Sequence, residues 1–384
     1  MLKIAIGHTE EIDSDEAAEE ILEQCKAELG EEKATAGILY ASIDHEFDSL
    51  LKKINEEHPD IELIGCTTDG ELSSVIGFAE DSVTLILFSS DEIDIKAGVA
   101  DGVSEGLEQK IADSIKNTKD RSDKELKLCI LNPVSITSSG AVILEIFKQS
   151  LGENFPIFGA SAADQWKFEQ TYQFHKTEVL TDAVPFLLFS GNLLIGSGVD
   201  SGWTPIGNPG KVTRVENNIL YSIDDKTAVE FFQHYLGENI TPLGEYPLAV
   251  FENEESDKFY LRAPLASNMD DGSLVFAGDL TLGAKVQISH TTRDRIIEAS
   301  ERSISQSFES YSGKEPEVAI CFSCSGRKQV LGTRTSEEYE LLKKVNPDLK
   351  VFGLYGYGEI APIYQDSPSR FHNETFVSLL LGTK

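Results

Sequence analysis

The chain of 384 residues nearly repeats one stretch of its own sequence, and this repeat limits the folds that it can adopt. Residues 50–72 read LLKKINEEHPDIELIGCTTDGEL, and residues 341–360 read LLKKVNPDLKVFGLYGYGEI. If residues 56–58 are a small insertion, both stretches contain a helix end, a Pro-Asp turn, a short apolar strand and a loop of the form G-x-x-x-x-G-E. A fainter third copy, IFGASAAD, contains Gly159 and Asp164. The sequence therefore predicts one structural unit that occurs three times.

The repeated loops place glycines and an acidic residue together at the end of a strand. Glycine permits positive φ and close approach of a ligand, and Glu71 or Glu359 can accept a hydrogen bond from an amine or a hydroxyl. A tight turn whose acid caps a backbone amide would use the same residues. Because each of three copies carries an acid, we predict a shared ligand pocket, although duplication alone would also preserve a turn. The residues assigned to this pocket from the loops are Gly353, Gly358, Glu71, Glu359 and Asp164.

Apolar patterning places each copy in a strand–helix–strand unit that is followed by further strands. The units cover residues 36–89, 126–190 and 317–381. A strand–helix–strand connection is a right-handed crossover within one sheet, and strands added without helices are antiparallel. We therefore predict an α/β fold with mixed β-sheets, helices packed outside, repeated β-α-β-β units and two domains. Helical periodicity is present at residues 13–29, 45–57, 139–151, 226–236, 291–311 and 336–345.

Charge and cysteine content disfavour several classes of function. The chain has 33 basic and 65 acidic residues, a formal net charge of −32, which disfavours nucleic acids and anionic membranes as partners. Its 5 cysteines are too few and too scattered for a disulfide framework. The apolar run at residues 184–195 is interrupted by Pro185 and by polar residues, so we expect no membrane insertion. We expect a soluble, cytoplasmic protein.

Several residues outside the repeated loops are further candidates for chemistry. In a strand, Cys321 and Cys324 would point to opposite faces, and no second cysteine pair completes a zinc site. Arg327 follows a buried strand, where a guanidinium either clamps a carboxylate or forms a surface ion pair. His372 opens the final strand, near the loop that ends at Glu359. Cysteine nucleophiles need a neighbouring base, which local sequence does not supply for Cys66.

An ordered set of short motifs is similar to the signatures of one known family. The motifs are GCTTDGE at 65–71, GASAAD at 159–164, GWTPIG at 202–207, RAPL at 262–265, CSGR at 324–327, GLYGYGEI at 353–360 and FHNET at 371–375. On these residues the chain resembles a FIST protein, with an N-terminal FIST domain over residues 1–215 that contains two repeat units and a C-terminal FIST domain over residues 216–384.

The resemblance implies a sensory, ligand-binding role in prokaryotic signal transduction, with small molecules such as amino acids as ligands. We expect a partner in trans, such as a histidine kinase or a diguanylate cyclase. In this interpretation Arg327 holds a carboxylate and Glu359 an amine, with Arg262 as a second anion candidate. The remaining residues assigned to the pocket, which would shape it, are Tyr355, Tyr357 and His372.

Two alternatives stay open at this point. Some members of the family are haem proteins that sense nitric oxide, and noncovalent haem would need an axial histidine, with His372 as first candidate and His290 behind it. The other alternative is a cysteine-dependent hydrolase that uses Cys66. The first interpretation requires no catalytic residue, no metal and no cofactor.

Overall fold

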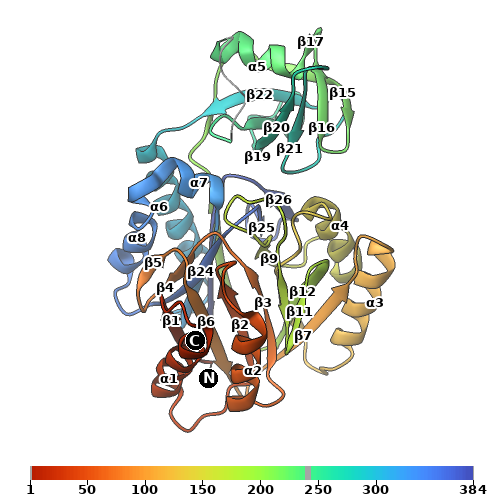
Figure 1. Cartoon of the computed structure of the whole chain (residues 1–384). Coiled ribbons are helices and arrows are strands. Elements are labelled where there is room, and N and C mark those ends of the chain that lie inside the picture. The colour runs from red at the N-terminus through yellow and green to blue at the C-terminus, as the bar shows by residue number, and fades with distance from the viewer. Residues whose placement is uncertain (1, 238–243, 384) are drawn as a thin grey trace.

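Three six-stranded mixed sheets form the body of the protein (Figure 1). The structure is a computed structural model, and it describes residues 2–237 and 244–383. The first sheet has the order β1 (Lys3–Thr9), β6 (Val83–Ser89), β2 (Ala36–Ala41), β3 (Glu62–Thr67), β10 (Gln173–His175), β11 (Glu178–Leu180). The second has the order β26 (Ser369–His372), β25 (Glu359–Pro362), β9 (Ile157–Ala160), β8 (Leu126–Leu131), β12 (Ala183–Gly191), β7 (Ile93–Asp101). The third has the order β13 (Leu194–Asp200), β27 (Phe376–Gly382), β23 (Val318–Cys324), β24 (Lys350–Gly356), β4 (Glu71–Ser73), β5 (Gly77–Ala79).

The three sheets follow one pattern, so the body has a pseudo-threefold arrangement. In each sheet one parallel pair, β2–β3, β8–β9 or β23–β24, is flanked by antiparallel strands. Each sheet ends in a hairpin that belongs to another unit: β4–β5 joins the third sheet, β10–β11 the first, and β25–β26 the second. The predicted mixed sheets and repeated units are confirmed, and the exchanged hairpins tie the three units into one closed body.

The first glycine of each repeated loop is required by this close pairing of strands. A Cβ at Gly65 or Gly159 would lie 1.9 Å from the carbonyl oxygen of Leu39 or Leu131 on the adjacent parallel strand. A Cβ at Gly353 would lie 2.3 Å from the carbonyl oxygen of its neighbour on β23. These distances are far shorter than any van der Waals contact, so a side chain cannot be accommodated at these positions. This glycine is therefore structural in all three loops.

Helices cover the outer faces of the sheets, and the inner faces share one core. Ile38, Ile130 and Ile320 occupy equivalent positions on the three parallel pairs, and all three are fully buried in the same central cluster. Burial of each such side chain stabilises the fold by about 2 kcal/mol. The covering helices are α1 (Ser14–Leu29), α2 (Phe47–Glu57), α3 (Leu107–Lys119), α4 (Gly140–Leu151), α6 (Arg293–Ser310), α7 (Ser325–Leu331) and α8 (Glu337–Val345), with a short 3-10 turn at Gly332–Arg334. None of the helices in the described part of the chain is long and apolar enough to cross a membrane.

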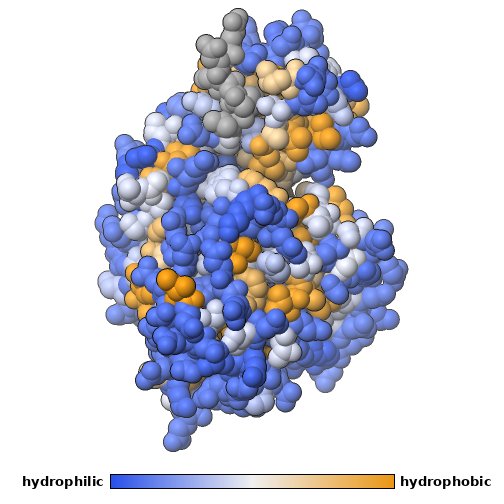
Figure 2. All heavy atoms as spheres, in the orientation of Figure 1, coloured by the Kyte–Doolittle hydropathy of each residue, from blue (hydrophilic) through white to orange (hydrophobic). Residues whose placement is uncertain are grey.

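A second domain, residues 201–292, is inserted between β13 and α6 and lies above the strand ends of the body (Figure 1). We call it the insert domain. It has its own apolar core, and the expected boundary at residue 215 lies within its strand β15. Figure 2 shows a mostly hydrophilic surface, with hydrophobic residues where the insert domain meets the body. Its elements are β14 (Thr204–Pro205), β15 (Gly210–Glu216), β16 (Ile219–Ile223), β17 (Lys226–Thr227), α5 (Ala228–Leu236), β18 (Leu248–Phe251), β19 (Phe259–Arg262), β20 (Pro264–Asn268), β21 (Ser273–Phe276) and β22 (Lys285–His290).

Candidate functional site

The tips of the three repeated loops meet around the pseudo-threefold axis through a closed ring of backbone hydrogen bonds. In each loop, the residue four positions after the first glycine donates its backbone N–H. The acceptor is the carbonyl oxygen of the residue two positions after the first glycine of another loop. The three bonds are Asp69 N to Tyr355 O at 2.9 Å, Tyr357 N to Ser161 O at 3.1 Å, and Ala163 N to Thr67 O at 2.9 Å. The predicted convergence of the loops is thus present, and it brings the following strands and their acids together.

The residues that begin the three exchanged hairpins are the equivalent acid positions of the repeat. Each of them pairs with the residue that directly follows the first glycine of a repeated loop. The three residues are Glu71, Gln173 and Glu359. All three side chains are fully buried. In two of them the same backbone bond recurs, from Ala183 N to Gln173 Oε1 at 3.2 Å and from Thr375 N to Glu359 Oε2 at 3.1 Å. The third position therefore carries an amide, where the sequence comparison had placed Asp164.

Asp164 instead organises the long loop that precedes β10. Its carboxylate accepts hydrogen bonds from the backbone N–H groups of Phe168, Glu169 and Gln170 at 2.8 to 3.1 Å. The hydroxyl of Tyr357 also donates to Asp164, at 2.8 Å. Because these donors occupy the carboxylate, Asp164 fixes a loop and holds Tyr357 in place.

One carboxyl oxygen of Glu359 has no hydrogen-bond partner. In Glu71, the equivalent residue of the first unit, both carboxyl oxygens accept a hydrogen bond. In the first unit, the hydroxyls of Thr68 and Ser82 each donate to one oxygen of Glu71. In the third unit, the position of Thr68 is occupied by Gly356, so the corresponding hydroxyl is missing. Thr375 bonds only Oε2 of Glu359, and Oε1 is buried without a partner. The third unit thus contains an unpaired acceptor, whereas in the first unit hydroxyl groups of the protein bond both equivalent oxygens.

A second buried carboxyl, Glu374, lies beside Glu359 and also has an unpaired oxygen, Oε2. Burial raises the pKa of each of the two carboxyls to about 8, and the charge of Glu374 further raises the pKa of Glu359. Glu374 packs against the start of α7, where a Cβ at Gly326 would lie 2.2 Å from Glu374 Oε1. The unpaired buried oxygens Asp69 Oδ2, Ser161 Oγ and Ser325 Oγ belong to the same converging tips and to α7. A buried oxygen without a partner is costly, so the carboxyl oxygens of Glu359 and Glu374 indicate a missing hydrogen-bond donor.

Ser325 and Lys328 have the S-x-x-K spacing of some serine hydrolases, which sequence reasoning did not single out. Lys328 Nζ bonds Asp69 Oδ1 at 3.0 Å and Glu80 Oε1 at 2.8 Å. Although burial opposes it, the charges of these two carboxylates raise the pKa of Lys328. A lysine that keeps its proton cannot serve as the general base that a serine nucleophile needs.

Arg327 and Tyr355 belong to an internal network in which Glu338 is the central acceptor. Arg327 Nη2 bonds Glu338 Oε1 at 2.6 Å, and the hydroxyl of Tyr355 donates to Glu338 Oε2 at 2.6 Å. Arg327 also donates to Ser300 Oγ and to the carbonyl oxygen of Ile296. Arg327 and Glu338 are fully buried. The carboxylate expected as a ligand group for Arg327 is therefore supplied by the protein itself.

Arg262, by contrast, is nearly buried and has no carboxylate partner among the described ion pairs. Its Nε donates to Asp279 O and its Nη1 to Phe371 O, both at 3.0 Å, while its guanidinium lies over the ring of Tyr260. These bonds tie the insert domain to the loop that leads to Glu374. Phe371, whose carbonyl oxygen accepts from Arg262, precedes Glu374 by three residues, so the guanidinium contacts the same loop that carries Glu374.

The histidines and cysteines of the alternative interpretations are held in structural contacts. His372 is buried, its pKa is lowered by burial to about 4, and its Nε2–H donates to Ala361 O at 3.0 Å. His290 Nδ1 lies 3.3 Å from the carbonyl oxygen of Thr291. Cys66 is fully buried, and burial raises the pKa of its thiol well above the ordinary value. The arrangement offers neither an exposed imidazole at His372 nor a reactive thiolate at Cys66, while His290 is half-buried.

Comparison with known proteins finds two domains of one family along the chain. The FIST N domain matches residues 35–226, and the FIST C domain matches residues 228–362. An uncharacterised protein of Methanocaldococcus jannaschii is 27% identical over 304 residues, which are 72% of this chain and 57% of that protein. The chain thus spans little more than half the length of this relative.

Two solved structures of cyanuric acid hydrolase are distantly similar. The one from A. caulinodans covers 100% of this chain and 99% of its own, at 8% identity and a TM-score of 0.42. The other covers 100% of both chains, at 8% identity and a TM-score of 0.38. Both scores are too low to support an inference about this chain. The two matched domains together cover most of the sequence, and the chain therefore belongs to the FIST family, whose domains are associated with signal transduction and ligand sensing.

Proposed function

We propose that this protein is a cytoplasmic sensor that binds a small polar metabolite with an amine and a carboxylate, such as an amino acid. The ligand would bind where the loop tips of the body meet the insert domain. The observation that supports this proposal is the pair Glu359 and Glu374, two adjacent buried carboxyls that each have an oxygen without a partner.

A protonated amine supplies what this carboxyl pair lacks. An ammonium group has three N–H donors and a positive charge, and two carboxylates that share it become ionised and fully bonded. Each buried oxygen left unpaired costs about 1–3 kcal/mol, so a ligand that satisfies both recovers a comparable free energy. The corresponding position in the first unit, Glu71, is bonded on both oxygens and would not attract a ligand.

Arg262 is the residue that we assign to the ligand carboxylate. It replaces Arg327 in this role, since Arg327 already pairs with Glu338. Arg262 lies at the interface between the two domains and bonds the loop that leads to Glu374, so one ligand with both charges would contact both domains. Tyr357 would then limit the site from the side of the loop that Asp164 organises.

The same interface offers a route for signalling. Arg262 Nη1 donates to Phe371 O at 3.0 Å, and Ala263 N donates to Asn373 Oδ1 at 3.3 Å. Because Glu359 and Glu374 are closed to solvent, ligand entry requires the insert domain or this loop to move. A bound ligand would hold the insert domain in one position. A partner in trans, such as a histidine kinase or a diguanylate cyclase, would read that position.

The site favours binding over catalysis. The candidate base Lys328 is held protonated between Asp69 and Glu80, and burial raises the pKa of the Cys66 thiol. A non-enzymatic role is therefore part of the proposal.

A thermal-shift screen with the protein amino acids and their decarboxylated amines tests the proposal. We expect one or more amino acids to raise Tm, and Glu374→Gln to abolish the shift while Glu71→Gln preserves it. Because binding would ionise both carboxyls, calorimetry of the hit in buffers of different ionisation enthalpy should detect proton release. The proposal fails if no compound shifts Tm, or if Glu71→Gln and Glu374→Gln weaken binding equally.

A further inference from the structure

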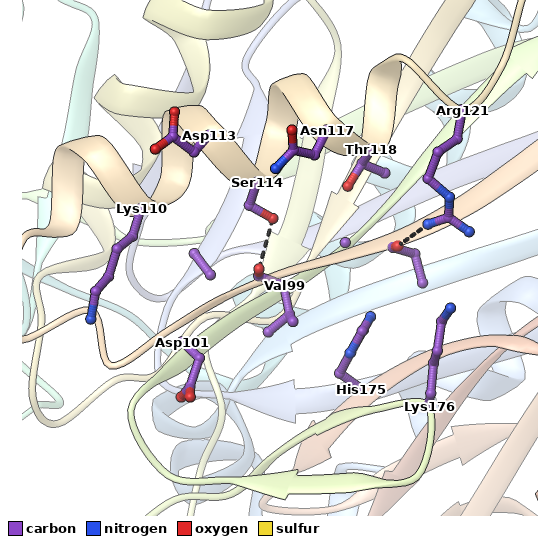
Figure 3. A pocket seen from close by; sticks show the side chains of 13 residues that line it. Val99, Asp101, Lys110, Asp113, Ser114, Asn117, Thr118, Arg121, His175 and Lys176 are labelled. Carbon is purple, nitrogen blue, oxygen red and sulfur yellow. Dashed lines mark hydrogen bonds between the residues drawn. The ribbon is translucent and has the colours of Figure 1, made fainter.

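A groove runs along the free edge of β7, between helix α3 and the β10–β11 hairpin (Figure 3). Its volume is about 490 Å³, within the range of sites for small molecules. The strand β7 is the last of its sheet, so one of its edges has no strand partner. Side chains on α3 and just after it bond part of this edge: Ser114 Oγ to Val99 O at 2.7 Å, and Arg121 Nη1 to Ala97 O at 2.8 Å. These hydrogen bonds hold α3 and the segment after it against the β7 edge that lines the groove.

The charge of this groove differs from that of the protein as a whole. Basic residues are outnumbered 33 to 65 in the whole chain, yet the groove is lined by three basic residues and two acidic ones. Figure 3 shows Arg121, His175 and Lys176 at one end of the groove and Asp101 at the other. Glu62, which lies against Arg121 and Lys176, makes the groove nearly neutral. In a protein with a net charge of −32, such a groove repels an anion less than the rest of the surface does. The lining charges are Lys110, Arg121, Lys176, Asp101 and Asp113.

The basic end is held in place by Glu62 beneath it. Glu62 Oε1 pairs with Arg121, and Glu62 Oε2 accepts the N–H of Ala97 at 3.1 Å. Lys176 Nζ is 3.6 Å from Glu62 Oε2, which is beyond a hydrogen bond, and its side chain is 39% exposed. The Glu62 carboxylate thus lies beside two cations. Because it is too far from Lys176 Nζ for a hydrogen bond, the ammonium N–H groups of Lys176 can bond a ligand.

Two features at the hairpin turn place polar groups in the wall of the groove. Lys176 has φ of +56°, a left-handed conformation in which glycine or asparagine is the usual residue. His175 Nδ1 lies 3.3 Å from Glu178 Oε2, while its Nε2 is buried with no hydrogen-bond partner. The tight turn between β10 and β11 accounts for this φ, and it places the lysine beside the unpaired imidazole nitrogen in the wall of the groove.

From these observations we propose that the β7 groove binds a small phosphate-bearing metabolite, with Lys176 and Arg121 on the phosphate oxygens and His175 Nε2 as a further polar contact. Asn117 and Thr118, which also line the groove, offer polar groups for the rest of the ligand. This site is separate from the proposed amino-acid site, so each can fail without the other.

Binding of glycerol 3-phosphate, measured by calorimetry at low ionic strength with glycerol as the neutral control, tests the proposal. We expect saturable binding of the phosphate and none of glycerol. Lys176→Gly should weaken binding about tenfold, because it removes one charge-assisted contact. Glycine suits the positive φ at this turn, so the variant should remain folded.

Two further variants separate a specific contact from general charge. Lys176→Arg should retain binding. Lys116→Ala, an exposed lysine on α3 that does not line the groove, should leave it unchanged. The proposal is overturned if the wild-type protein does not bind saturably, or if Lys176→Gly and Lys116→Ala have equal effects.

Discussion

Replacing Glu359 by glutamine should make the protein more stable, and increasingly so as the pH rises. The folded state raises the pKa of this carboxyl from the ordinary 4.5 to about 8, mainly through burial. Between these values the folded protein binds a proton that the unfolded chain has released, so the stability of the wild-type protein falls as pH increases. The free energy involved is about 1.36 kcal/mol per pH unit, or roughly 3 kcal/mol between about pH 5 and about pH 7.5. Glutamine keeps an oxygen that can accept the hydrogen bond from Thr375 and does not titrate.

Urea denaturation at the two pH values, followed by circular dichroism, measures this effect. The difference in unfolding free energy between Glu359→Gln and the wild type should grow by roughly 3 kcal/mol from the lower to the higher pH. Glu374 is present in both proteins and its pKa of about 8 lies above both pH values, so its titration contributes little to the difference. Glu23→Gln, at an exposed position of α1, should show no such growth. A difference that is the same at both pH values would refute the argument that Glu359 is a buried carboxyl held neutral by its surroundings.

Three other substitutions test the architecture. Gly65→Ala should prevent folding or cost several kcal/mol, because its Cβ would lie 1.9 Å from Leu39 O; soluble expression and urea denaturation report this. Arg327→Met should destabilise by about 3–5 kcal/mol, since it leaves Glu338 buried and unpaired, and a second substitution, Glu338→Leu, should restore most of the loss in thermal unfolding. Asp164→Ala should release its loop, which increased acrylamide quenching of tryptophan fluorescence would detect, and unchanged quenching would contradict.

The sequence predicted the periodic elements well because their signals are local. The helix expected at residues 13–29 is present as Ser14–Leu29, and Asp13 accepts hydrogen bonds from two N–H groups of its first turn, as a cap should. Helix α3 was missed, although Leu107, Ile111 and Ile115 form an apolar row four residues apart. A row of three apolar residues among many polar ones is a weak signal, and only packing against β7 makes it decisive.

The candidate site was less accessible to sequence reasoning because it depends on pairings between distant segments. Gln173 was not recognised as the third acid position, since the loop that Asp164 organises separates it from its repeat. The exchange of hairpins between units leaves no local mark, so the order of strands could not be foreseen. An arginine after a strand looks the same whether its partner is a ligand or, as for Arg327, an internal Glu338.

The central claim, that Glu359 and Glu374 await a ligand amine beneath the insert domain, is tested most directly by a crystal structure with the amino acid that gives the largest thermal shift. The account predicts electron density in which the ligand nitrogen lies within hydrogen-bond distance of both carboxyls and its carboxylate lies against Arg262. Density at another surface, with the two carboxyls still unpaired, would contradict it.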